Sequence, residues 1–396
     1  MHLEARHLTD VVIAGANRTP VGKYGRAFRN VEAVKLGSLV ISEAVNRAGL
    51  VPADIEEVIL GNVIQAGLGQ NPARQAAIFA GLPDRIGAVT VNKVCASGMK
   101  SVAIASDAIK ARSAEVIVAG GMESMSRAPY IVKEARWGVG YNNVQFIDAM
   151  VHDGLLDVYN RFHMGVTGEI VSERFRVTRE DQDAFALESH RRASRATMEG
   201  KFKAEIVPVE LPDGSRVDVD EGVRTDTSME KLARLPPVFR DGGLVTAGNA
   251  SQLSDGASAM VVLSREAADR HGVKPLAQIV DYVTSGTKPE WVMEAPIPAV
   301  RKLLKKTGLS IDDFDLVEHN EAYASASVAI LRELGIPHEK LNVHGGAVAL
   351  GHPLGCSGAR ILTTLVHAMR DRNAKRGLAT LCLGGGNAMA MAIERA

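Results

Sequence analysis

The chain has 396 residues, 46% of them hydrophobic, which is enough to bury a large core and excludes a disordered class. Lysine plus arginine and aspartate plus glutamate each number 46, so the formal net charge of zero gives no reason to expect nucleic acid or a membrane surface as a partner. The N-terminus is polar, no apolar run approaches the ~20 residues of a membrane-spanning helix, and the three cysteines are widely spaced. These features predict a soluble cytoplasmic protein.

Two stretches of the chain follow the same plan. Residues 37–62 predict a helix, a Gly-Leu end, an acidic turn and a strand ending in asparagine, and residues 296–320 predict the same series. The glycines that end the two helices, Gly49 and Gly308, stand 259 positions apart. Such a match predicts that one structural unit occurs twice.

A second pair of stretches repeats with nearly the same offset. Residues 95–121 and 355–386 both open with small residues and Ser-Gly, continue as a helix and end in a strand that runs into glycines. Gly98 and Gly358 stand 260 positions apart, within one residue of the first offset. The agreement of the two offsets favours a duplication of the whole unit.

The segment between the last two strands differs greatly in length between the two halves, which indicates an insertion in the first half. In the second half only "GGGN" separates them, whereas in the first half residues 121 to about 250 intervene, with a helix of their own near 179–199. We therefore expect an α/β protein with a duplicated five-layer αβαβα fold and an inserted loop domain. The expected boundaries are 1–120 with 251–270 for the first core half, 121–250 for the loop domain and 271–396 for the second half.

Cys95, in "VNKVCASGMKS", lies where a strand ends and a helix begins. If the helix starts near Ala96, its positive end favours the thiolate and lowers the thiol pKa, which suits a nucleophile. The alternative is a small buried core residue, the usual state of a free cysteine. Cys356 pairs by offset with Ala96 rather than with Cys95, so we interpret it as a packing residue.

Three further motifs stand near the same place in the predicted fold. His352, in a glycine-rich loop, is the pseudo-symmetric counterpart of the Cys95 region, either as a base for the thiol or as a structural loop residue. Cys382 ends a strand, where α/β proteins place their sites, and the N–H of Gly384 could help to form an oxyanion hole. Asn320 is either a helix N-cap or a site amide that binds a water or a carbonyl.

Other site chemistries lack their motifs. No CxxC or HExxH pair occurs, which argues against zinc, and no complete dinucleotide or P-loop fingerprint is present. The sequence therefore directs attention to cysteine chemistry.

Taken together, "VCASGMK", "NEAYA", "GHPLGCSGAR" and "CLGGGNA" resemble the thiolase family, and the resemblance extends from "RTPVGKYG" at 18–25 to the terminal glycines. It implies that Cys95 accepts the acyl group, that His352 activates it and that Cys382 is a second acid/base. Asn320 and Gly384 match residues of the oxyanion holes. It also implies that no metal or cofactor is needed, that acyl-CoA thioesters are the substrates, and that the chain is a homotetramer whose loop domain binds coenzyme A and makes oligomer contacts.

The substrate range is narrowed by "HDGLLDVYNRFHMGVTGEIV" at 152–171, which resembles acetoacetyl-CoA thiolases and would put His163 and Met164 beside the thioester. Coenzyme A contacts implied by the resemblance are Arg224, Ser228 and Ser251. The expected activity is that of an acetyl-CoA C-acetyltransferase of lipid metabolism. A broader 3-ketoacyl-CoA thiolase, a carrier-protein ketosynthase and an inactive acyl-binding relative stay open.

Overall fold

The computed structural model describes residues 9–396 and is built around one continuous sheet with two halves. From edge to edge the strand order is β14 (Leu316–His319), β15 (Arg376–Leu383), β16 (Asn387–Arg395), β13 (Ala277–Gly286), β1 (Val11–Arg18), β12 (Ser254–Ser264), β5 (Val116–Ser124), β3 (Glu57–Gly61) and β4 (Gly87–Val91). A short strand, β2 (Gly22–Lys23), pairs with β12. The two halves join through the brief pairing of β1 with β13.

The same pairing pattern occurs in each half, which confirms the predicted duplication of the fold. β5 pairs in parallel with β3 and antiparallel with β12, and β15 pairs in parallel with β14 and antiparallel with β16. At the outer edge β4 lies parallel to β3, and a parallel bridge from Val317 to Leu341 takes the same position beside β14.

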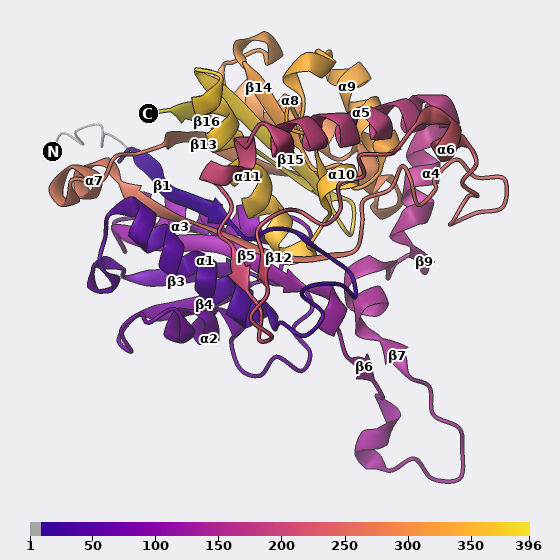
Figure 1. Ribbon diagram of the computed structural model, residues 1–396, viewed down its shortest axis with the longest axis horizontal. Helices are drawn as coiled ribbons and strands as arrows, with labels where there is room; N and C mark the ends of the chain where they lie inside the picture. The colour runs from indigo at the N-terminus through magenta and orange to yellow at the C-terminus, as the bar shows by residue number, and fades with distance from the viewer. Residues whose placement is uncertain (1–8) are drawn as a thin grey trace, which may run out of the picture.

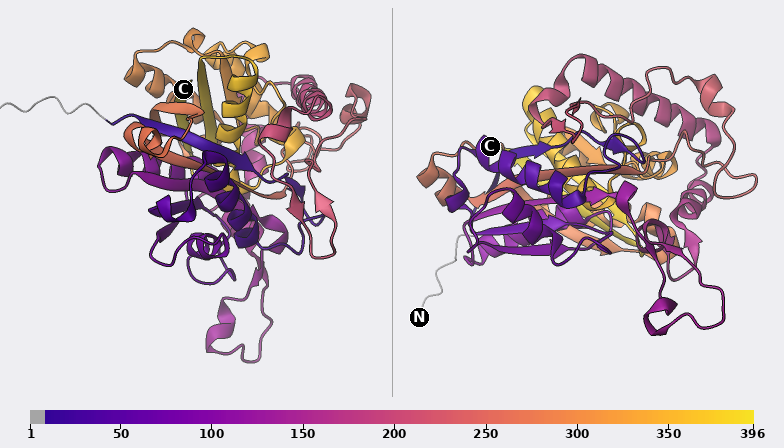
Figure 2. Two further views of the ribbon diagram at one scale, coloured as in Figure 1. Left: turned by 60° about the vertical axis from the view of Figure 1, so that its left-hand side comes forward. Right: turned by 60° about the horizontal axis from the view of Figure 1, so that its bottom comes forward.

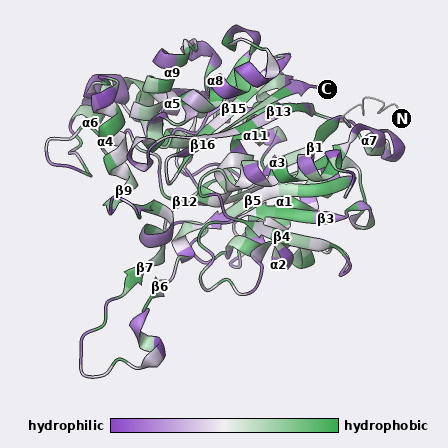
Figure 3. Cartoon of the chain, turned by 180° about the vertical axis from the view of Figure 1, so that it is seen from behind, coloured by the Kyte–Doolittle hydropathy of each residue, from purple (hydrophilic) through white to green (hydrophobic). Residues whose placement is uncertain are grey.

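Helices complete five layers, as predicted (Figures 1 and 2). The outer pairs are α1 (Ala33–Ala48) with α2 (Pro72–Phe79) and α8 (Pro296–Thr307) with α9 (Ala324–Leu334), and the middle layer is α3 (Ser97–Lys110) with α11 (Leu354–Asp371). The strands between these layers are largely apolar, as the colouring of Figure 3 shows. The inner strands β1, β5, β12 and β15 are almost fully buried, because helices cover both faces of the sheet. Gly49 and Gly308 end α1 and α8 with left-handed backbone (φ 73° and 72°).

The two middle helices approach each other closely near their N-terminal ends. A Cβ added to Gly98 would lie 2.7 Å from the Ala359 nitrogen, and one added to Gly358 would lie 2.5 Å from the Met99 nitrogen. The repeated Ser-Gly of the two halves therefore allows backbone contact, which brings the loops that precede α3 and α11 to one place.

Residues between β5 and β12 form the insertion. It contains α4 (Met164–Arg174), α5 (Arg179–Met198), α6 (Met229–Ala233) and the short strands β6 (Tyr130–Ile131), β7 (Ile147–Asp148), β8 (Leu156–Asp157), β9 (Phe162–His163), β10 (Val209–Glu210) and β11 (Arg216–Val217). Two short helices lie outside it, α7 (Arg265–His271) and α10 (Ala347–Leu350). The arm between β6 and β7 projects far from the body (Figures 1 and 2). Within residues 9–396, no helix is long and apolar enough to cross a membrane.

Candidate active site

A cavity of about 510 Å³ collects most of the residues that the sequence singled out. Its lining comes from the loops before α3 and α11, from the end of β15 and from the insertion. The predicted site residues that line it are Cys95, His163, Met164, Arg224, Ser251, His352, Cys382 and Gly384.

Cys95 lies in a tight turn between β4 and α3. The preceding residue, Val94, has φ +47°, a conformation that is strained for a β-branched side chain. Ser97 holds this turn: its Oγ donates to the Val94 carbonyl at 2.6 Å and accepts from the Lys93 N–H at 2.8 Å. The strained turn presents the half-buried Cys95 thiol to the cavity.

The predicted lowering of the Cys95 pKa by the helix is wrong. Helix α3 begins at Ser97, so the thiol stands before the helix, and burial raises the pKa of Cys95 to about 12. The backbone N–H groups of Gly384 and of Cys95 itself act in the opposite direction, because they hydrogen-bond the thiolate, and the charge of Glu123 raises the pKa further. The resting group is therefore a neutral thiol that needs a base, held between two donors that favour negative charge.

Alkylation of Cys95 tests its pKa. Because iodoacetamide reacts with the thiolate, a pKa near 12 predicts a rate that rises about tenfold for each pH unit from pH 7 to pH 9. Peptide mass mapping at each pH gives the rate for Cys95 alone, and buried Cys356 serves as the internal control. A rate already at its plateau at pH 7 would mean that the helix does lower the pKa.

His352 supplies the base. Its Nδ1 lies 2.5 Å from the Oγ of Ser357, and that hydroxyl donates its only hydrogen to the Pro353 carbonyl at 2.9 Å. With the hydroxyl hydrogen on the Pro353 carbonyl, Nδ1 carries the imidazole proton, and the Nε2 lone pair is the one that can accept a proton. Burial, and to a lesser extent the charge of Arg360, lower the pKa of His352 to about 3, so the ring is neutral over the physiological range.

Asn320 is a buried neighbour of the His352 ring, and it is not the N-cap of a helix. β14 ends at His319 and α9 begins only at Ala324, with Tyr323 as its N-cap residue. A tight turn, in which the Ala322 N–H donates to the Asn320 carbonyl, lies between them. The Nδ2 of Asn320 lies 3.4 Å from the Nε2 of His352, and its buried Oδ1 has no hydrogen-bond partner within residues 9–396. The amide can thus hold a water beside the imidazole.

Cys382 is a buried thiol near the end of β15, and it lines the same cavity as Cys95. Its Sγ lies 3.7 Å from the Sδ of Met293. Burial raises the pKa of Cys382, and the charge of Cys95 raises it further. A negative charge on one of these two sulfurs therefore disfavours a second on the other, which suits separate roles for them.

His163 and Met164 form the wall contributed by the insertion. The Nδ1 of His163 accepts the Gly165 N–H at 3.0 Å, which leaves Nε2 as the position for the ring hydrogen, and burial lowers the pKa of the ring. His163 stacks on Phe239 at 4.8 Å between ring centroids, and Phe239 meets Tyr323 edge to face at 6.0 Å. Sequence reasoning missed both aromatic residues, although Tyr323 lies within the "NEAYA" motif.

Arg224 and Ser251 also line the cavity. The Arg224 N–H donates to the Nδ1 of buried His190 at 3.1 Å, and the Ser251 N–H donates to the Ala322 carbonyl at 3.0 Å. Ser228 does not line this cavity, because its hydroxyl caps α6 by accepting the Lys231 N–H at 3.3 Å. Across residues 9–396, no group of three histidine, cysteine or acidic side chains is arranged to hold a metal.

Comparison with known proteins matches the whole described chain. The family profile described as "Thiolase, N-terminal domain" matches residues 11–266, and "Thiolase, C-terminal domain" matches residues 273–395. Among curated proteins, "Acetyl-CoA acetyltransferase" of Syntrophomonas wolfei is 49% identical over 97% of this chain and 99% of the relative, and the protein of the same name from Chromobacterium violaceum is 48% identical over 98% and 100%. The crystal structure of the Bacillus anthracis acetyl-CoA acetyltransferase superposes with a TM-score of 0.96, at 43% identity over 98% of this chain and 99% of that chain.

Proposed function

The chain belongs to the thiolase family, and from this membership we propose that it is an acetyl-CoA C-acetyltransferase, which joins two acetyl-CoA molecules into acetoacetyl-CoA and free coenzyme A and also catalyses the reverse cleavage. The names of relatives that are 48–49% identical over their full length support this activity. The observation that carries it is the single cavity lined by Cys95, His352 and Cys382, in which two backbone N–H groups hydrogen-bond the Cys95 thiolate.

The first half of the reaction moves an acetyl group to Cys95. As the Cys95 sulfur attacks the thioester carbonyl, His352 takes the thiol proton at Nε2, so no free thiolate has to accumulate despite the raised pKa. The oxyanion that develops meets the N–H groups of Cys95 and Gly384; one such donor is typically worth about 3–4 kcal/mol. The carbon–sulfur bond to coenzyme A breaks, and the departing thiolate takes its proton from Cys382. This transfer leaves Cys382 as the thiolate and His352 protonated for the second half.

The second half forms the carbon–carbon bond. The Cys382 thiolate removes a proton from the methyl group of the second acetyl-CoA, and the enolate oxygen is stabilised by protonated His352 and by a water held on Asn320. The enolate carbon attacks the acetyl carbonyl on Cys95, the carbon–sulfur bond to Cys95 breaks, and His352 returns its proton to that sulfur. All of these steps use residues of the chain itself. A thioester intermediate is as reactive as the substrate, which makes both directions accessible.

The acyl end of the cavity favours a short substrate. Met164, Met293 and Phe239 line the cavity with bulky side chains, and the Met293 sulfur lies 3.7 Å from the Cys382 sulfur. Coenzyme A-dependent cleavage of 3-ketoacyl-CoA substrates of increasing length tests the assignment, with the highest kcat/KM expected for acetoacetyl-CoA. A preference for long chains would replace the proposal with a broader thiolase, and no cleavage of any of them would contradict thiolase activity itself.

Ser357 orients the base, which gives a prediction. Ser357→Ala removes the acceptor of the His352 Nδ1–H, so the ring can change tautomer and rotate. We expect kcat for cleavage to fall about a hundredfold with KM unchanged, since a displacement of about 1 Å costs that much. Ser106→Ala is the matched control, because the buried Ser106 hydroxyl of α3 has no partner within residues 9–396. Equal activity of the two variants would contradict this role for Ser357.

We further propose that the chain forms a homotetramer through the arm between β6 and β7. This arm exposes Trp137, Tyr141 and Phe146, with Trp137 91% exposed. Exposed aromatic side chains on a projecting arm suit contact with a second copy of the chain. The double variant Trp137→Ser/Tyr141→Ser is expected to lower the mass measured by light scattering from tetramer to dimer without loss of secondary structure. An unchanged mass would contradict the proposed contact.

The proposal also covers the compartment in which the protein works and the residues that contact coenzyme A. The three free cysteines suit the reducing cytoplasm. Arg224 and Ser251 line the cavity, and the guanidinium of Arg224 suits a phosphate of coenzyme A. His163 and Met164 complete the wall beside the thioester. Ser228, whose hydroxyl caps α6, stays a proposed coenzyme A contact outside the cavity lining.

A further inference from the structure

The stretch "RTPVGKYG" has no role in the chemistry described above, yet it runs from the core to the cavity. Arg18 ends β1 and is fully buried, whereas Lys23 and Tyr24 line the cavity. A buried arginine is costly unless its donors are satisfied, so its partners indicate what it holds.

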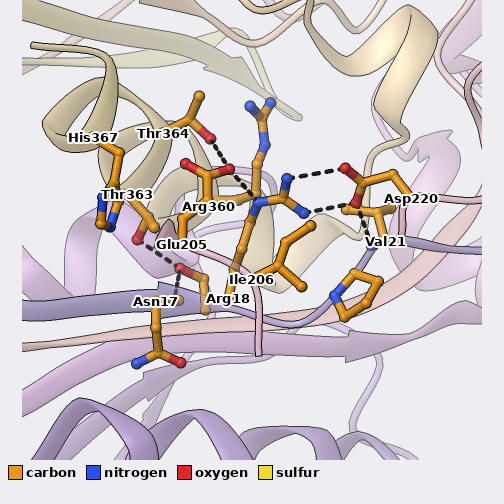
Figure 4. A network of polar contacts seen from close by, with 12 residues as sticks. Asn17, Arg18, Val21, Glu205, Ile206, Asp220, Arg360, Thr363, Thr364 and His367 are labelled. Atoms are coloured by element: carbon orange, nitrogen blue, oxygen red, sulfur yellow. Dashed lines mark hydrogen bonds and ion pairs between the residues drawn. The ribbon is translucent and has the colours of Figure 1, made fainter. Parts of the chain in front are cut away.

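Arg18 is held almost entirely by the insertion (Figure 4). Its Nε donates to Glu205 at 2.6 Å, and its two terminal nitrogens donate to the two oxygens of Asp220 at 2.7 and 2.9 Å. The Arg18 backbone also donates to the Glu205 carbonyl and accepts from the Val207 N–H. Glu205 in turn accepts the Thr364 hydroxyl of α11 at 3.2 Å. One side chain thus ties the first core half to two separate points of the insertion.

From Asp220 the ties continue toward the cavity. Asp220 also accepts the Val21 N–H at 2.8 Å, and Glu221 accepts the Lys23 N–H at 2.9 Å. The next carbonyl, of Gly222, accepts the Gln252 amide at 2.9 Å. A Cβ on Gly222 would lie 2.5 Å from the Ala349 carbonyl oxygen, so this backbone has no room to shift toward the loop that leads to His352.

Two residues beyond Gly222 stands Arg224, at the cavity wall. We propose that Arg18 is a positioning residue for the coenzyme end of the site: by holding Asp220, it fixes the backbone of residues 220–224 and thereby sets Arg224 where it meets a phosphate of coenzyme A. This inference rests on the proposed coenzyme contact of Arg224. Arg18 touches no reacting atom, so its loss affects coenzyme affinity rather than the chemical step.

Arg18→Lys keeps the charge and loses the forked contact with Asp220. We expect KM for acetoacetyl-CoA to rise about tenfold and kcat to stay within about twofold. With acetoacetyl-pantetheine, which lacks the phosphates, KM should not change. Thr364→Val is the matched control, because it removes a neighbouring contact of Glu205 and leaves the Arg18–Asp220 pair intact.

The decisive comparison is the double variant Arg18→Lys/Arg224→Ala. If Arg18 acts through Arg224, the double variant has the same KM as Arg224→Ala alone, whereas additive effects would overturn the inference. A fall in kcat with KM unchanged, or an equal rise of KM for the pantetheine substrate, would also overturn it.

Two further measurements keep the test independent of folding and of turnover. If Arg18→Lys does not fold, Glu221→Ala, which loosens the half-buried end of the same segment, should raise KM about threefold, and only when Arg224 is present. The dissociation constant of coenzyme A, measured by calorimetry, makes the same comparison without catalysis. A wild-type protein that binds coenzyme A but cleaves no thioester would contradict the proposed function, while the binding data would still decide the role of Arg18.

Discussion

Cys382→Ala is expected to abolish the formation of acetoacetyl-CoA while the variant still takes up an acetyl group on Cys95. In this variant acetyl transfer needs only the Cys95 sulfur and the Nε2 of His352, because His352 can return to coenzyme A the proton that it took from Cys95. Condensation needs a base at the methyl carbon, and the thioester methyl is too weakly acidic to ionise unaided. General-base catalysis is worth about 10²–10⁴-fold, so we expect at least that loss.

Two rates measured on the same preparation test this division of labour. Exchange of labelled coenzyme A into acetyl-CoA reports acetyl transfer, and acetoacetyl-CoA formation reports condensation. Cys356→Ala is the control, because Cys356 is buried in α11 and does not line the cavity; it should retain both rates. A folded Cys382→Ala variant that cannot exchange coenzyme A would show that Cys382 is also essential to acetyl transfer.

Cys95→Ala is expected to have the opposite defect. Without the attacking sulfur, both coenzyme A exchange and acetoacetyl-CoA cleavage should fall to background. The substitution leaves Cys382 in the cavity wall, where it can still act as the base toward the methyl group. The variant should therefore still exchange the methyl hydrogens of bound acetyl-CoA with solvent, which mass spectrometry in deuterium oxide detects.

The control for that exchange is the double variant Cys95→Ala/Cys382→Ala, which should exchange no faster than free acetyl-CoA. Residual cleavage by the single Cys95→Ala variant would mean that another group carries the acetyl. Hydrogen exchange that survives in the double variant would mean that Cys382 is not the base.

The fold was predictable because its signals are local and occur twice. A helix that ends in a left-handed glycine, as at Gly49 and Gly308, is legible from a few residues, and the common offset of the repeats links the two halves. Cys95, His352 and Cys382 could be grouped for the same reason: each lies at an equivalent loop or strand end, and the halves are related by the duplication.

What could not be predicted depends on burial and on distant partners. The prediction of a lowered Cys95 pKa was wrong because the sequence shows the nearby helix but not the burial of the thiol. Burial has the larger effect on the pKa. Asn320 was compatible with an N-cap because the sequence does not show how many loop residues separate the strand from the helix. In the structure α9 begins only at Ala324. The partners of Arg18, at positions 205 and 220, lie about two hundred residues away, beyond any local pattern.

The claim on which the account depends is that Cys95 alone carries the acetyl group. Incubation with acetyl-CoA, rapid acid quench, digestion and peptide mass spectrometry locate the modification directly. The account predicts acetyl on the peptide that contains Cys95 in the wild type and in Cys382→Ala, and on no peptide of Cys95→Ala. Acetyl on Cys382 or Cys356 in place of Cys95 would contradict it.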